Sequence, residues 1–252
     1  MGEHRFHTPE PVELEVKIPS GDIEIETIEG DESFVSLDGD EKLIELAEVR
    51  QEGRRIIVEL KGKKSFGITI SIGDFSFGSG QITVRAQVPH GSTTNLSTAS
   101  ADMKLRGRLQ SLDVKTASGD LVVNGEIERE ATVKTVSGDV RLERVGGELR
   151  VQTVSGDVTA QTVGGSIVAK SVSGDFRIES AREGHVTAQS VSGDIELGVA
   201  AGTNLDVDAG SVSGDLASEV PLGSDPGANI VDGPTLVVRG KTVSGDFRVF
   251  RA

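Results

Sequence analysis

Residues 135–158 read TVSGDVRLERVGGELRVQTVSGDV, and the segment ends with the same six residues with which it begins. The serine of the motif Ser-Gly-Asp recurs at Ser20, Ser118, Ser137, Ser155, Ser173, Ser192, Ser213 and Ser244, and residues 100–102 form a Ser-Ala-Asp variant. From residue 100 onward the serines are 18, 19, 18, 18, 19, 21 and 31 residues apart. A period near 18 residues is typical of a solenoid, in which each repeat forms one coil.

Within one period, apolar and polar residues alternate, with one interruption every nine residues. Alternation predicts β-strands, and an interruption predicts a bend between them, so each coil divides into the halves VSGDVRLER and VGGELRVQT. Read by parity, Val136 and Gly138 point inward, whereas Thr135, Ser137 and Asp139 point outward.

The sequence therefore predicts an all-β protein, a β-solenoid or stacked-strand repeat domain with about 18 residues per coil and an irregular N-terminal β cap. We expect a single domain over 1–252. Residues 1–95 form the irregular cap strands, 96–217 the regular repeats, and 218–252 a loop and a closing strand.

Three features are expected inside the cap. Residues 40–48, DEKLIELAE, have the spacing of a short amphipathic helix, and a hairpin is predicted around Gly53. Residues 67–88 are expected to form two strands around a turn rich in Gly and Ser. Near the other end, 219–234 contain three prolines and predict a long surface loop before the last strand.

Composition restricts the function classes. The formal net charge of −14 disfavours nucleic acid and anionic membrane surfaces as partners. The chain has no Cys, which removes disulfides and thiolate chemistry, and it has no Trp or Tyr. The N-terminus has no apolar signal region, and no stretch approaches 18 uninterrupted apolar residues, so we expect a cytoplasmic protein without direct membrane insertion.

The Ser-Gly-Asp motif has a structural and a functional interpretation. In the structural one, Gly relieves crowding or adopts a positive φ at a bend, while Ser and Asp satisfy backbone donors. In the functional one, the hydroxyl and carboxylate columns form a binding face for a protein partner or a second copy of the chain. On the central coils that face would consist of Thr135, Ser137, Asp139, Thr153, Ser155, Asp157, Ser171, Ser173 and Asp175.

A column of aspartates raises an electrostatic question. Like charges stacked about 5 Å apart repel by roughly 0.8 kcal/mol per neighbour in water. Two features could offset this repulsion: the cations Arg141, Arg177 and Arg248, each two residues beyond its Asp, and hydrogen bonds from backbone N–H groups.

Two alternatives use the Asp columns differently, as ligands of a calcium-dependent binding protein or as catalytic groups of a β-helix enzyme. The calcium-binding nonapeptide G-G-x-G-x-D-x-U-x does not match, because here Gly and Asp are adjacent and the second half-coil lacks the aligned Asp. The histidines, including His4 and His7, do not combine with a third ligand or a Ser/Asp pair. We therefore expect no catalytic residue, cofactor or metal.

Five segments together resemble a known family: FHTPEPVELEV at 6–16, IPSGDIEIE at 18–26, ITVRAQVPHGS at 82–92, the TVSGDV coils and KTVSGDFRVFR at 241–251. They resemble the bacterial β-strand repeat proteins labelled putative adhesins, which are toastrack-like domains of unknown function. The resemblance covers nearly the whole chain. It implies a stacked-strand fold and a non-enzymatic, adhesin-like binding or scaffolding role. A self-assembling scaffold is a further alternative.

Overall fold

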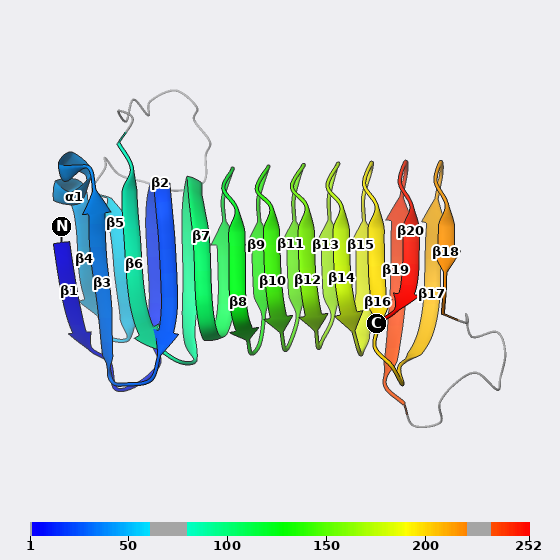
Figure 1. Ribbon diagram of the computed structural model, residues 1–252, viewed down its shortest axis with the longest axis horizontal. Helices are drawn as coiled ribbons and strands as arrows, with labels where there is room; N and C mark the ends of the chain where they lie inside the picture. Colours follow the sequence, from blue (N-terminus) through cyan, green and yellow to red (C-terminus); the bar gives the residue numbers. More distant parts are fainter. Residues whose placement is uncertain (1, 61–79, 221–232) are drawn as a thin grey trace.

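The computed structural model describes residues 2–60, 80–220 and 233–252, and these residues form twenty strands and one short helix. The coils stand side by side along the long axis of the molecule, as Figure 1 shows. Within the described residues, no helix is long and apolar enough to span a membrane. The predicted all-β solenoid is confirmed.

Each regular coil places one strand on each of two faces. The first face contains the strands that precede a Ser-Gly-Asp corner: β9 (Ala131–Lys134), β11 (Leu149–Gln152), β13 (Ile167–Lys170) and β15 (Gly184–Gln189). The second face contains those that follow it: β8 (Leu121–Ile127), β10 (Val140–Val145), β12 (Val158–Val163), β14 (Phe176–Ala181) and β16 (Ile195–Val199). Every strand pairs in parallel with its equivalent in the next coil, so that Val140, Val158 and Phe176 lie in one row.

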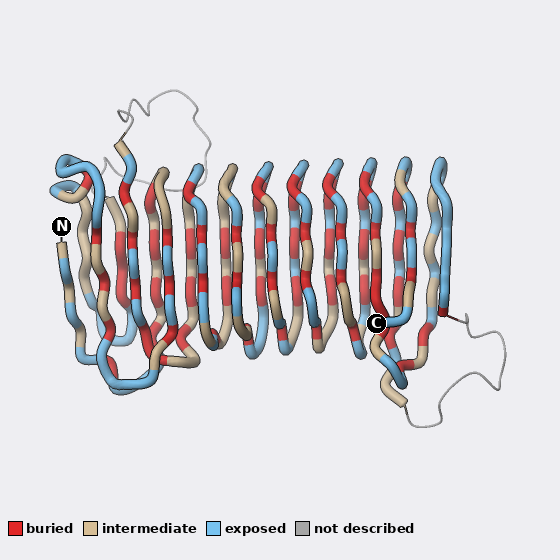
Figure 2. Tube along the Cα trace, in the orientation of Figure 1, coloured by how far each residue is buried: buried red, intermediate tan, exposed pale blue. Residues whose placement is uncertain are grey.

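The core lies between the two faces. In β10 and β11, alternate side chains are buried, as the alternation in the sequence predicts. Figure 2 shows the same alternation of buried and exposed residues along most coils. Burial of each Val, Leu, Ile or Phe side chain stabilises the fold by about 1.5–3 kcal/mol relative to exposure.

Regular stacking begins earlier than predicted. The long strands β2 (Glu13–Ile28) and β7 (Ser92–Lys115) each run through both faces and pair in parallel with one another. Their corners are in register, because Ser20 pairs with Ser100 and Asp22 with Asp102. Part of the predicted cap is therefore already solenoid.

The N-terminal end is built from antiparallel additions to two parallel strands. β5 (Arg55–Leu60) and β6 (Ile82–Pro89) each pair in parallel with β2. Antiparallel strands then cover them: β4 (Ala47–Glu52) on β5, β3 (Glu32–Gly39) on β6 and β1 (Gly2–His7) on β3. The predicted helix is α1 (Glu41–Leu46), and the predicted hairpin is β4–β5, with Gly53 at φ +60°. Of the two strands predicted in 67–88, the second is β6, and the first lies outside the described residues.

The C-terminal coils do not stack in sequence order, which corrects the prediction that the last repeat closes the stack. The last repeat forms β19 (Thr235–Thr242) and β20 (Phe247–Arg251), and the preceding one forms β17 (Asn204–Ser211) and β18 (Leu216–Ser218). β19 pairs with both β15 and β17, and β20 with both β16 and β18. The β19–β20 coil is thus the penultimate one, as Figure 1 shows.

The difference in apolar content explains this order. The β19–β20 coil buries Leu236, Val238 and Phe247 almost completely, and it gains neighbours on both sides. In the β17–β18 coil, Leu216 is exposed, and its charged strand β17 includes Asp206 and Asp208. A charged strand suits an open edge because it discourages pairing with other chains. The predicted loop over 219–234 lies mostly outside the described residues.

Candidate binding surface

The stacked Thr-Val-Ser-Gly-Asp corners form one long edge of the solenoid. We call this surface the repeat edge, and define it as residues 116–120, 135–139, 153–157, 171–175, 190–194, 242–246 and 211–215, in the order of stacking. The predicted binding face lies on it.

A buried hydroxyl fixes the shape of each central corner. Thr135 is 7% exposed, and its Oγ1 accepts a hydrogen bond from the N–H of Gly138 at 3.0 Å. Thr153 and Ser171 hold the next two corners in the same way, at 2.9 and 2.7 Å. The hydroxyl replaces a backbone acceptor in the turn, as Ser and Thr often do.

Glycine is required at the corner because the coils approach closely. A Cβ added to Gly156 would lie 2.0 Å from the carbonyl oxygen of Gly138, and one added to Gly174 would lie 2.1 Å from that of Gly156. Gly119, where the regular coils begin, has in addition a φ of +115°. The sequence predicted that Gly relieves crowding or adopts a positive φ, and the structure shows both. Relief of crowding is the reason that applies from coil to coil along the stack.

The aspartates form a hydrogen-bonded ladder along the repeat edge. Each carboxylate oxygen Oδ1 accepts the backbone N–H of the aspartate in the next coil, at 2.8–3.1 Å. In the order of stacking the accepting carboxylates are Asp102, Asp120, Asp139, Asp157, Asp175, Asp194 and Asp246, and the backbone N–H of Asp215 is the last donor. Charge-assisted bonds of this kind are stronger than neutral ones, so they offset the repulsion between neighbouring carboxylates.

The arginines contribute less to this compensation than the sequence suggested. Arg141 Nη2 contacts Asp139 Oδ2 at 3.2 Å. Arg177 instead pairs with Glu179 and Glu196, and Arg248 pairs with Glu219. The hydrogen bond with Glu179, together with the charges of both glutamates, raises the pKa of Arg177. Backbone N–H groups are therefore the main partners of the ladder.

The structure corrects the inward and outward assignment at the corner. Thr135, Thr153 and Ser171 are buried, although parity placed them outside. Val136, placed inside by parity, is 45% exposed. The alternation fails here because the chain bends, and the hydroxyl that bonds the glycine N–H must turn inward.

The other members of the predicted face stay outside. Ser137, Ser155 and Ser173 are exposed, and each hydroxyl lies 3.4 Å from a backbone oxygen of the preceding coil. The carboxylates Asp139, Asp157 and Asp175 are half-buried to exposed members of the ladder. The repeat edge therefore brings together the predicted Ser and Asp columns, but not the Thr/Ser column that precedes them.

Sequence reasoning missed an exposed apolar column on this edge. Six valines follow one another from coil to coil: Val136, Val154, Val172, Val191, Val243 and Val212. They are six of the eight large hydrophobic side chains that are exposed in the described residues. The sequence signal was the hydroxyl residue that precedes each valine, because a buried hydroxyl at that position forces the valine outward.

On the side of the valine column opposite the serines and aspartates, the first face carries a column of basic residues. Lys134, Lys170 and Lys241 are exposed, alternate with Gln152 and Gln189, and form no ion pair with the described residues. From one side to the other, the basic column and the repeat edge therefore form one surface that presents lysine, valine, serine and aspartate. Its two rims carry opposite charges.

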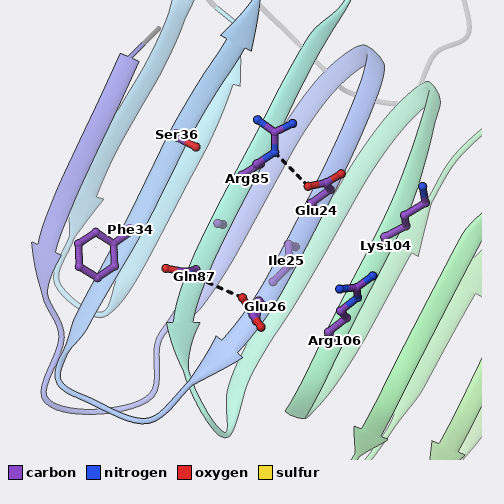
Figure 3. Close-up of a pocket in the computed structure, with 10 residues that line it drawn as sticks. Glu24, Ile25, Glu26, Phe34, Ser36, Arg85, Gln87, Lys104 and Arg106 are labelled. Carbon is purple, nitrogen blue, oxygen red and sulfur yellow. Dashed lines mark hydrogen bonds and ion pairs between the residues drawn. The ribbon is translucent and has the colours of Figure 1, made fainter.

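A depression of about 370 Å³ lies elsewhere, over the outer side of β3, β6, β2 and β7. Figure 3 shows Arg85 bonded to Glu24, at 3.0 Å between Nε and Oε2. Lys104 and Arg106 come from the neighbouring strand, where they are the register partners of Glu24 and Glu26. Opposite charges in adjacent strands balance one another, so this depression is less distinctive than the repeat edge.

The histidines are dispersed. His4 stacks on Phe6, His7 lies 4.0 Å from Asp31, and His90 Nδ1 lies 2.7 Å from Thr27 Oγ1. The described part of the chain contains no group of three or more His, Asp or Glu side chains that could hold a metal ion.

The family model described as Toastrack DUF4097 matches residues 12–249, which confirms the resemblance seen in the sequence. The structure is similar to that of a putative adhesin from Bacteroides fragilis NCTC 9343, at a TM-score of 0.56 and 15% identity, covering 98% of this chain and 95% of the other. It is also similar to a putative lipid binding protein from Parabacteroides distasonis ATCC 8503, at a TM-score of 0.50 and 15% identity, with 98% and 96% covered. No curated protein matches the chain. At this identity the two structures establish the fold alone.

Proposed function

Since the chain belongs to the Toastrack DUF4097 family, we propose that it is a non-enzymatic interaction module that binds a protein partner through the repeat edge. A fold by itself does not specify a function, so the binding role is argued from the side chains of the repeat edge.

The valine column carries this proposal. Single exposed hydrophobic residues are ordinary, but contiguous apolar surface rimmed by polar residues marks an interaction site. Here the valines lie in one line, with serines and aspartates on one side and lysines on the other. Turn chemistry requires the buried hydroxyl, the glycine and the aspartate, but nothing in the corner requires an exposed valine.

The regularity of the carboxylates supports a role other than catalysis. A catalytic site needs a few groups that differ from their surroundings and converge on one reacting atom. The ladder carboxylates are instead equivalent, and each one already accepts a backbone N–H. They form a single file along the stack, whereas a calcium ion takes six to eight oxygen ligands around one point.

The test is capture of partners from extracts of cells that also express an untagged copy of the chain. The bait is the tagged full chain, compared with Val154→Asp/Val172→Asp. We expect the wild type to retain a partner, which can include the untagged chain, and the double variant to lose it. The matched control is Val122→Asp/Val168→Asp, which changes outward valines on the two faces.

Circular dichroism establishes that the variants fold. Equal capture by the wild type and by Val154→Asp/Val172→Asp would refute a binding role for the repeat edge, and so would capture by neither.

Thermal unfolding in EDTA and in millimolar Ca²⁺ separates this proposal from cation-dependent binding. We expect the same midpoint in both, because each ladder carboxylate is bonded to a backbone N–H of the next coil. A ligand that binds only the folded state raises the midpoint, so a calcium-driven rise of many degrees would replace the proposal with the cation-dependent alternative.

A further inference from the structure

We propose that the partner on the repeat edge is a second copy of this chain, docked side by side so that the two solenoids run in the same direction about a twofold axis parallel to the stack. This inference rests on the proposed function and names the partner of that surface.

The order of side chains across the edge is the first argument. In the coil that contains residues 134–139, the outward residues are Lys134, Val136, Ser137 and Asp139 in turn. Lys170, Val172, Ser173 and Asp175 repeat that order two coils further on. Along the stack the valine column is thus bordered by a basic rim and an acidic rim.

Charge complementarity selects the partner and its orientation. When a copy is rotated by 180° about an axis parallel to the stack, its lysine rim faces the aspartate rim of the other copy, on both sides of the paired valines. When it is rotated about an axis perpendicular to the stack, lysines face lysines and aspartates face aspartates, and such like-charge contacts are strongly unfavourable. The parallel arrangement satisfies both rims, and a twofold interface uses the same patch on each copy.

The repeat spacing is the second argument. Coils are separated by about 4.8 Å in any parallel stack, so two copies in the same register match coil for coil along their whole length. A partner with a different spacing would lose register after a few coils. A second copy has the required spacing by construction.

No other described segment of the chain covers the repeat edge. The described parts of the cap and of the terminal coils add strands at the two ends of the stack, and Figure 1 places none of them along the repeat edge.

The first measurement is the mass of the full chain in solution, from low to high micromolar concentration, by size-exclusion chromatography with light scattering. We expect twice the monomer mass for the wild type and the monomer mass for Lys134→Glu/Lys170→Glu, in which both rims become acidic. Lys104→Glu/Arg144→Glu makes the same change in net charge on the second face, at two cations without an ion pair in the described residues, and should remain dimeric.

Cysteine crosslinking tests the orientation, because the natural chain has no Cys. About an axis parallel to the stack, every valine of the column faces its own equivalent. We therefore expect Val136→Cys, Val154→Cys and Val243→Cys each to form a disulfide-linked dimer under mild oxidation. Val168→Cys, on the outer side of the first face, should not.

The outcomes separate this inference from the proposed function. A wild-type chain that stays monomeric throughout overturns the inference, even if valine-dependent capture of another protein upholds the proposed function. A dimer that survives Lys134→Glu/Lys170→Glu, or that crosslinks only at one position near the middle of the column, also overturns it. A monomer without valine-dependent capture overturns both.

Discussion

Substitution of Gly156 by Ala tests how tightly the coils are stacked at the repeat edge. The new Cβ would lie 2.0 Å from the carbonyl oxygen of Gly138 and 2.8 Å from its carbonyl carbon. Both atoms belong to the backbone of the preceding coil, so no side chain can rotate away. Ordinary contact begins at 3.4 Å, so the two coils must separate locally by about 1.4 Å to restore it.

Three hydrogen bonds surround this contact and weaken when the coils separate. All three join the two coils: Val154 N–H and Ser155 N–H donate to Val136 O at 3.3 and 2.9 Å, and Asp157 N–H donates to Asp139 Oδ1 at 3.1 Å. At about 1 kcal/mol each, their loss costs about 3 kcal/mol. Alanine also restricts the unfolded chain, which returns about 0.4–1 kcal/mol. The expected net loss in the free energy of unfolding is about 2 kcal/mol.

Thermal unfolding followed by far-ultraviolet circular dichroism measures this loss. For a chain of this length, about 2 kcal/mol corresponds to a midpoint lowered by about 4–8 °C. The matched control is Gly210→Ala, in strand β17, where an added Cβ meets no atom within 4 Å and φ is not positive. We expect that variant to equal or slightly exceed the wild type in stability. A Gly156→Ala variant as stable as Gly210→Ala would refute close approach as the reason for the glycine column.

Three further perturbations address the corner and the coil order. Thr153→Val removes the acceptor of the Gly156 N–H and should lower the free energy of unfolding by about 1–2 kcal/mol, whereas Ser155→Ala should lower it by less than about 0.5 kcal/mol. Urea unfolding measures both losses, and equal losses would contradict the role of the buried hydroxyl. Asp157→Ala should lower the free energy of unfolding by about 1 kcal/mol, whereas Asp157→Asn keeps an oxygen acceptor and should retain most of the wild-type stability. If urea unfolding shows that Asp157→Asn is as unstable as Asp157→Ala, the charge matters and the oxygen acceptor does not. Deletion of 233–252 removes the described strand partners of β17 and β18. The backbone amides of β17 and β18 should then exchange with solvent as fast as those of an unfolded chain, and retained protection of these amides would contradict the observed coil order.

The sequence was sufficient for features that depend on local pattern. The 18-residue period gave the stacked coils, and the alternation gave the buried residues of strands such as β10 and β11. The short helix and the hairpin around Gly53 were predicted from local spacing and turn chemistry. These signals suffice because a strand that buries one face must alternate, whatever its neighbours are.

Tertiary structure decided what depends on contacts between coils. Parity predicted an inward Val136 and an outward Thr135, because it assumes an extended strand, and the corner reverses both. The insertion of the last repeat between β15–β16 and β17–β18 was not visible in the spacing of the motif. Coil order depends on which repeat gains most from two neighbours, and that gain is a property of the whole stack and not of any one segment.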